Sequence, residues 1–292
     1  MKLKTYVKLR NTVAVFLAIF VFLFFAVLFL LIASLTADYD ARTLPTYAQE
    51  DLGEILAKPK EARTDEDYEI LSMQTGVLLR SAVEQLSDEE ILQFQRAFFF
   101  EGEVRHEQVA ITTVRDMLFN PETGQPFYAP IVALEPGDIL VTSTAHTFGW
   151  RNGHAALALE RGRLLQSFSL GYPSEIVGLD TYAGLPLFCS GTNFMVLRLK
   201  NATLEERLAI ARDAEEQLKG IPYTLIVGIF MAKDQGTMPE GTHCSHLVWQ
   251  AYKNAGYDID PDGGPVVTCR DIANSPYFEI VQTYGFDPLS GW

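Results

Sequence analysis

The sequence is poor in cysteine and in basic residues, and each shortage excludes a class of protein. Three cysteines in 292 residues are too few for a disulfide scaffold, and none of them has zinc-ribbon spacing. With 23 basic against 37 acidic residues the formal net charge is -14, which makes the chain a poor binder of nucleic acid. We therefore expect a protein with no nucleic-acid partner, no cofactor and no structural metal.

Charge is also missing from one long stretch near the N-terminus. Residues 13–35, VAVFLAIFVFLFFAVLFLLIASL, contain no charged side chain. At about 1.5 Å rise per residue they span roughly 34 Å, enough to cross the hydrocarbon core of a bilayer. The apolar region of a cleaved signal peptide is usually shorter, about 7–15 residues. We expect residues 1–36 to be a retained transmembrane signal-anchor, with cleavage near residue 38 as the alternative.

The residues that flank this stretch predict its orientation. The preceding segment MKLKTYVKLR is basic, and the acidic residues Asp38 and Asp40 follow the stretch. Because basic residues favour the cytoplasmic side, the N-terminus should be cytoplasmic. The protein is then a single-pass membrane protein whose body is extracytoplasmic.

The remaining chain divides into three regions by composition. Residues 37–64 are polar and predict a linker with one short helical turn. Residues 65–130 predict a helical N-terminal extension. Its apolar residues have helical spacing over 65–86, and a capping box formed by Ser87 and Glu90 predicts a second helix to about Phe99. Residues 131–292 predict the main folded domain.

The pattern of the main folded domain predicts an α+β fold. Short apolar runs bounded by turn residues predict strands, and longer amphipathic segments ending at glycine predict helices. We expect an antiparallel sheet packed against the last long helix. The predicted strands are 139–141, 153–160, 162–169 and 193–199, and the helices are 204–220 and 242–255.

The segment GTHCSHLVWQAY, residues 241–252, holds the main candidate for chemistry. Thr242 can cap the helix, which places Cys244 in the first turn. The positive end of the helix dipole favours a thiolate there, the nucleophilic form of cysteine. The alternative is that Cys244 is a small buried apolar residue, which is the usual fate of a free cysteine.

A thiol nucleophile needs an imidazole base, and His154 is the best placed of the five histidines. It opens a predicted strand directly after the loop STAHTFGWRNG. His243 and His246 flank Cys244 and would allow a metal site instead, although no second short-spaced pair completes one. We expect their side chains to point away from the face of the helix that carries the thiol, or along that face, so that replacing them matters less than replacing His154.

Several motifs in a fixed order carry a resemblance to a known family. GDILVT, GHAALAL, GIPY, HCSHLVWQAYKNAG and TCRDIANSPYFEIV resemble the circularly permuted NlpC-type papain-like superfamily, in its YiiX/YaeF-like branch. Lecithin–retinol acyltransferase is a distant relative of that branch. The likeness covers about residues 134–282. The branch places the histidine strand before the cysteine helix, as His154 and Cys244 are ordered here, and it implies a papain-like fold.

The resemblance also implies roles for individual residues. Cys244 takes the place of the nucleophile and His154 that of the base. Gln166, on the strand after the histidine strand, falls where the family commonly has a glutamate. Tyr223 in GIPY matches a tyrosine near the cleft, although a core aromatic is the equal alternative. His246 departs from the family, which usually has glutamate there.

These residues imply acyl transfer through a cysteine thiolate. The leading interpretation is an extracytoplasmic cysteine amidase or peptidase that acts on cell-envelope peptide amides. A lipid acyltransferase or lipid amidase is the first alternative, because the apolar run TLIVGIFMA would suit an acyl chain. An inactive envelope-binding module is the second, because Gln166 brings no charge to the base. Cys189 and Cys269 are candidates for a disulfide that leaves Cys244 free.

Overall fold

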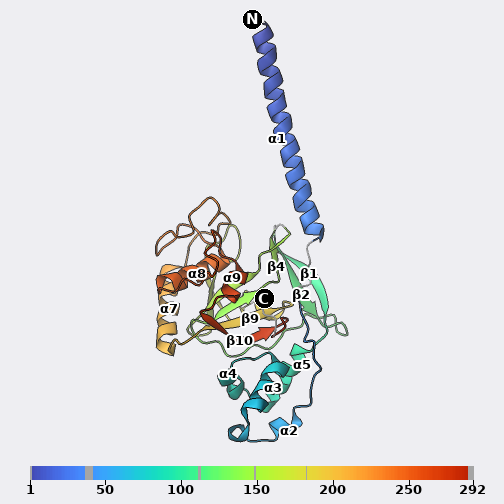
Figure 1. The fold of residues 1–292 in the computed structure, drawn as a ribbon, viewed down its shortest axis with the longest axis vertical. Helices are drawn as coiled ribbons and strands as arrows, with labels where there is room; N and C mark the ends of the chain where they lie inside the picture. The colour runs from blue at the N-terminus through green and yellow to red at the C-terminus, as the bar shows by residue number, and fades with distance from the viewer. Residues whose placement is uncertain (1, 37–41, 111–112, 148, 182, 289–292) are drawn as a thin grey trace.

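The computed structural model describes residues 2–36, 42–110, 113–147, 149–181 and 183–288. One long helix projects from a body of mixed helices and antiparallel strands (Figure 1). The predicted α+β class is therefore confirmed. The helices are α1 (Lys2–Thr36), α2 (Gly53–Leu56), η1 (Lys60–Ala62), α3 (Asp65–Thr75), α4 (Arg80–Gln85), α5 (Asp88–Phe98), α6 (Leu185–Cys189), α7 (Leu204–Gln217), α8 (Cys244–Asn254) and α9 (Cys269–Ala273). The strands are β1 (Glu103–Ala110), β2 (Thr113–Phe119), β3 (Ile139–Thr142), β4 (Ala145–Thr147), β5 (Trp150–Arg151), β6 (His154–Leu159), β7 (Arg163–Gln166), β8 (Glu175–Gly178), β9 (Phe194–Leu199) and β10 (Phe278–Tyr284).

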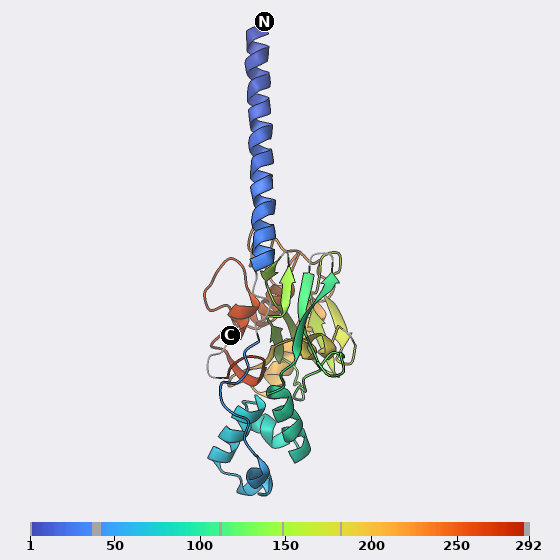
Figure 2. The ribbon, with the colours of Figure 1, turned by 90° about the vertical axis from the view of Figure 1, so that its right-hand side faces the viewer.

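The projecting helix α1 contains the uncharged stretch seen in the sequence. Within the described residues, Asn11–Phe29 is the segment long and apolar enough to cross a membrane. The helix projects away from the body (Figure 2). None of the side chains of this segment is buried. An apolar helix that packs on nothing in its own chain is consistent with a membrane anchor.

A six-stranded antiparallel sheet with the order β10-β9-β3-β6-β7-β8 forms the centre of the body. Successive side chains of a strand point to opposite faces. Ile139 and Val141 of β3 therefore join one apolar cluster, whereas Leu140 between them joins another. Both faces of the sheet are covered, which explains why its strands are nearly continuous apolar runs in the sequence.

Different helices cover the two faces. The cluster on the first face includes residues of α7, α8 and α9. The cluster on the second face includes Leu71 of α3 and Ile91 of α5. The predicted helices at 65–99 are thus part of the same core as the sheet, and the capping box of Ser87 and Glu90 at the start of α5 is confirmed.

The predicted N-terminal extension over 65–130 contains strands as well as helices. The helices end at Phe98, and β1 and β2 then form an antiparallel hairpin. This hairpin belongs to a second sheet with the order β1-β2-β4-β5. Valine occurs in both strands and threonine in the second. Such β-branched residues favour strands over helices.

The single helix expected over 65–86 is also interrupted. Gly76 adopts a left-handed conformation with φ 72° and ends α3. Val77 then pairs with Gln282 of β10 before α4 begins. Tertiary pairing of the backbone has therefore overridden a helical apolar pattern.

The predicted linker 37–64 is docked on the body from Arg42 onward. The Tyr47 hydroxyl donates to the carbonyl of Met73, and Leu52 is fully buried. The expected helical turn is α2. Residues 37–41 lie outside the described residues. The apolar side chains of this segment complete the helical cluster, which is why it does not remain a free linker.

Replacing Gly76 by alanine should destabilise the fold strongly. A methyl group there would overlap the carbonyl oxygen of Thr283 as well as force a left-handed alanine. We expect a loss of about 3 kcal/mol or more in the free energy of unfolding. Gly124→Ala is the control, because Gly124 has φ 67° but open space around it. It should cost only about 1 kcal/mol in denaturant titrations of the detergent-solubilised chain. Equal losses of unfolding free energy in the two variants would show that the structure rearranges to relieve the overlap at Gly76.

Candidate active site

Cys244 is the first residue of α8 and its side chain is 5% exposed. The expected capping by Thr242 is wrong. The residue at the cap position is His243, whose Nδ1 accepts from the backbone N–H of His246. The Thr242 hydroxyl instead bonds to Nδ1 of His246, at 2.9 Å. Cys244 nevertheless remains at the positive end of the helix, where the dipole favours a thiolate.

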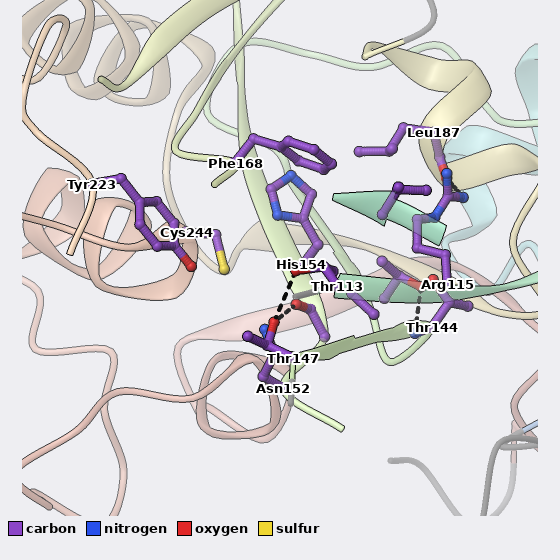
Figure 3. Close-up of a pocket in the computed structure, with 14 residues that line it drawn as sticks. Thr113, Arg115, Thr144, Thr147, Asn152, His154, Phe168, Leu187, Tyr223 and Cys244 are labelled. Carbon is purple, nitrogen blue, oxygen red and sulfur yellow. Dashed lines mark hydrogen bonds between the residues drawn. The ribbon is translucent and has the colours of Figure 1, made fainter. Parts of the chain in front are cut away.

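His154 is the first residue of β6 and is nearly buried. Its ring stacks on Phe188 and meets Phe168 edge-on, with centroid distances of 5.5 Å to each. Figure 3 shows the Cys244 sulfur in the same pocket, with the rings of Tyr223 and His154 on either side. The structure thus brings the predicted thiol and imidazole together, and two phenylalanines fix the plane of the imidazole.

Gln166 of β7 holds the other side of the His154 ring. The distance between His154 Nε2 and Gln166 Oε1 is 2.9 Å. Since an amide oxygen only accepts, Nε2 carries the ring proton and Nδ1 is left as the base. The Gln166 amide nitrogen donates to the Glu175 carboxylate of β8 at 3.4 Å, which points its carbonyl toward His154.

Glu175 is a residue that the sequence reasoning missed. The register of β7 and β8 pairs Gln166 directly with Glu175. A carboxylate therefore lies behind the Gln166 amide, on the side away from His154. To find Glu175 from the sequence, one would have had to predict strand β8 and its pairing with β7.

Cys269 and His243 also contact the thiol, and sequence reasoning missed both. A hydrogen bond from Cys269, followed by bonds from His154 and His243, holds the pKa of Cys244 well below its ordinary value, although burial acts in the opposite direction. The pKa of Cys269 is raised because it donates to Cys244 and is buried. The side chain of His243 therefore does not point away from the thiol.

The proposed pairing of Cys189 with Cys269 is not seen. All three cysteines are free thiols. Cys269 begins α9, and its sulfur lies against Cys244 because the N-termini of α8 and α9 meet. Cys189 ends α6, and burial raises the pKa of its thiol to about 12.

The ring nitrogens of His246 are both engaged away from the thiol. Nδ1 bonds to Thr242 and Nε2 bonds to the carbonyl of Lys233 at 2.9 Å. Burial lowers the pKa of His246 to about 4. A metal held by His243, Cys244 and His246 together is therefore not supported by the positions of their side chains.

Asp260, Asp262 and Asp271 bring carboxylate oxygens within 4.8 Å of one another. Hard cations favour such oxygen ligands. The Lys233 ammonium, however, binds Asp260 and the carbonyl of Gly264. The Lys233 ammonium therefore already neutralises part of the negative charge of these carboxylates.

Tyr223 lies beside the thiol because its backbone bridges to Thr242, two residues before Cys244. Burial and the neighbouring Cys244 raise the pKa of Tyr223. Its phenol therefore stays protonated and can donate a hydrogen bond. Tyr223 lines each of three cavities near the site.

These cavities differ in size and character. A cavity of about 20 Å³ has both Cys244 and His154 in its wall. A second, of about 410 Å³, reaches Cys244 from the side of α9 and includes Arg151 and Arg270 in its wall. A third, of about 650 Å³, has mostly apolar walls that include Leu170 and Tyr172. Apolar area forms the larger part of the wall of both larger cavities, and Arg270 adds a cation to the wall of the second one.

Comparison with known proteins adds one structural likeness. The sequence matches no protein-family model and no curated protein. The fold is similar to the crystal structure of the metalloprotein yiiX from Escherichia coli O157:H7, with 15% identity and a TM-score of 0.38. The match covers 50% of this chain and 95% of yiiX. A TM-score this low does not establish a common fold. The proposed function therefore rests on the contacts of Cys244.

Cys244 should react with iodoacetamide near neutral pH faster than Cys189. The thiolate is the reactive form, and the two thiols have pKa values shifted in opposite directions. His154→Ala should slow the labelling of Cys244, because one hydrogen bond to the thiolate is lost. Peptide mapping by mass spectrometry after timed alkylation measures both rates. Equal labelling of Cys244 and Cys189 in the native chain would show that Cys244 is not activated.

Cys269→Ala should raise the pKa of Cys244, because the largest stabilising hydrogen bond is removed. A rise of one in this pKa should lower the alkylation rate about ten-fold at any pH below the pKa, and the rate should recover at higher pH. Cys269→Ser keeps a donor and should stay closer to the native profile. Cys189→Ala is the matched control and should leave the profile unchanged. Identical profiles for Cys269→Ala and the native chain would exclude the role of Cys269.

Proposed function

We propose that the protein is a membrane-anchored cysteine hydrolase that acts by acyl transfer, with a papain-like arrangement of its site. The observation that carries the proposal is the convergence of three side chains from separate elements. The Cys244 thiol meets His154, and His154 is held by Gln166 at 2.9 Å. Nucleophile, base and orienting group in this order are the requirements of thiol catalysis.

In the proposed mechanism, Nδ1 of His154 takes the thiol proton. The thiolate attacks the substrate carbonyl, which forms a carbon–sulfur bond and a tetrahedral oxyanion. The backbone N–H of Cys244, at the start of α8, has no partner within the helix and is available to the oxyanion. The imidazolium gives its proton to the leaving group as the acyl thioester forms. Water, deprotonated by His154, then releases the acid.

Gln166 and Glu175 support the base in this scheme. The Gln166 carbonyl fixes the tautomer of His154, as an asparagine does in papain-like enzymes. The nearby Glu175 carboxylate supplies the negative charge that an amide lacks. The absence of charge at Gln166 therefore does not by itself favour an inactive binding module.

The proposed topology follows from α1. The apolar span Asn11–Phe29 anchors the chain, and the basic residues before it place the N-terminus in the cytoplasm. The site then faces the extracytoplasmic side, where cell-envelope peptides are available. Arg270 in the wall of the cavity of about 410 Å³ offers a cation to an acidic peptide amide, which is the first proposed substrate.

A lipid amide or ester is the second proposed substrate. The apolar cavity of about 650 Å³ has the volume and the wall chemistry for an acyl chain. Tyr223 separates this cavity from Cys244 and would lie beside the carbonyl of either substrate. Tyr223 is accordingly proposed to bind substrate.

The native chain should form a covalent acyl adduct on Cys244 with electrophilic amide probes. A panel that pairs acidic peptide probes with acyl-lipid probes separates the two substrate classes by rate. Cys244→Ala should abolish the adduct, and His154→Ala should slow it by about 10²- to 10⁴-fold because the general base is lost. Intact-mass spectrometry of the detergent-solubilised chain measures the adduct. A folded native chain that forms no adduct with any probe would favour the inactive binding module.

A further inference from the structure

An ordered turn before α8 presents apolar side chains to solvent. Ile229 is 60% exposed and Phe230 is 86% exposed. The turn is held by backbone hydrogen bonds from both residues to Ile226 and by the buried side chain of Val227. Gly228, at φ 82°, packs against the carbonyl of Pro265. The exposure is therefore built into a fixed turn.

A second exposed apolar segment runs beside the first. Leu170 and Tyr172 are 52% and 65% exposed. A backbone bridge between Pro173 and Pro222 joins their segment to the one that leads into the turn. Leu170 and Tyr172 also line the apolar cavity of about 650 Å³. Leu225, which leads into the turn with Ile229 and Phe230, lines the same cavity together with Tyr223.

The tether to α1 limits how far this surface can be from a bilayer. Arg42 is fixed to the body by hydrogen bonds to Phe100 and Tyr284. From Thr36, the last residue of α1, the chain to Arg42 reaches at most roughly 20 Å at about 3.5 Å per residue. The body therefore stays close to the membrane in which α1 lies.

One end of the body faces α1. The loops between α7 and α8 lie at that end, whereas α2 to α5 lie at the opposite end (Figures 1 and 2). The segment with Ile229 and Phe230 belongs to these loops. Exposed aliphatic and aromatic side chains at this end match the apolar groups that insert at a bilayer surface.

We propose that the apolar collar formed by Leu170, Tyr172, Ile226, Ile229 and Phe230 docks on the bilayer that holds α1. Ile229 and Phe230 insert among the acyl chains, and the cavity opens toward the membrane surface. The inference rests on the proposed anchor, and it gives the active site a route for substrates that reside in the bilayer.

The test uses the full chain in phosphatidylcholine vesicles whose acyl chains are brominated. Phe230→Trp should add tryptophan fluorescence that brominated lipid quenches at least about two-fold relative to plain lipid, because bromine quenches indole only within the bilayer. Glu69→Trp, on the exposed side of α3 at the far end of the body, is the matched control and should add unquenched fluorescence. The native chain supplies the background of its own tryptophans.

Extraction of the same vesicles with alkaline carbonate distinguishes a failure of the proposed anchor from a failure of the docking proposal. Release of the chain into the supernatant would contradict the anchor. A chain that is retained, but whose Phe230→Trp signal is as little quenched as that of Glu69→Trp, overturns the docking proposal alone. A collar covered by a soluble protein partner would give this second result. Phe230→Ser should also slow acylation by a bilayer-resident probe several-fold while leaving iodoacetamide labelling of Cys244 unchanged.

Discussion

Burial of both faces of the six-stranded sheet organises the whole body of the protein. Alternate side chains of β3, β6 and β9 enter two separate apolar clusters. Each cluster needs its own helical cover, so α8 is pressed on one face and α3 and α5 on the other. The position of Cys244 follows, because α8 lies against β6 with its N-terminus near His154. The packing that forms the core therefore also positions the residues of the site.

The site is a chain of polar groups in which each member orients the next, and all of them except the half-buried Glu175 are buried. Cys269 and His154 bond to Cys244, Gln166 bonds to His154, and Glu175 bonds to Gln166. In surroundings with little water such bonds are stronger than at the surface, and an unpaired member would be costly. This explains how a thiol that is 5% exposed can have a lowered pKa. The same burial, without such partners, raises the pKa of Cys189.

Two larger cavities adjoin this chain of groups. The cavity of about 410 Å³ beside α9 and the cavity of about 650 Å³ beside Tyr172 share Tyr223 in their walls. The exposed side chains of Leu170 and Tyr172 continue the apolar wall of the larger cavity to the surface of the protein.

The local features of this protein could be predicted from its residues alone. Apolar spacing located α1, α5, α7 and α8, strand-length apolar runs located β3, β6, β7 and β9, and residue chemistry singled out Cys244 and His154. Three-dimensional packing was needed to show that Cys269, His243 and Glu175 join the site, that Gly76 breaks a helix, and that residues 103–119 form a hairpin. Caps and periodicity act over a few residues, so a sequence records them. The meeting of Cys244 with Cys269 depends instead on how two helix ends pack, and that of Gln166 with Glu175 on strand register, which no local pattern encodes.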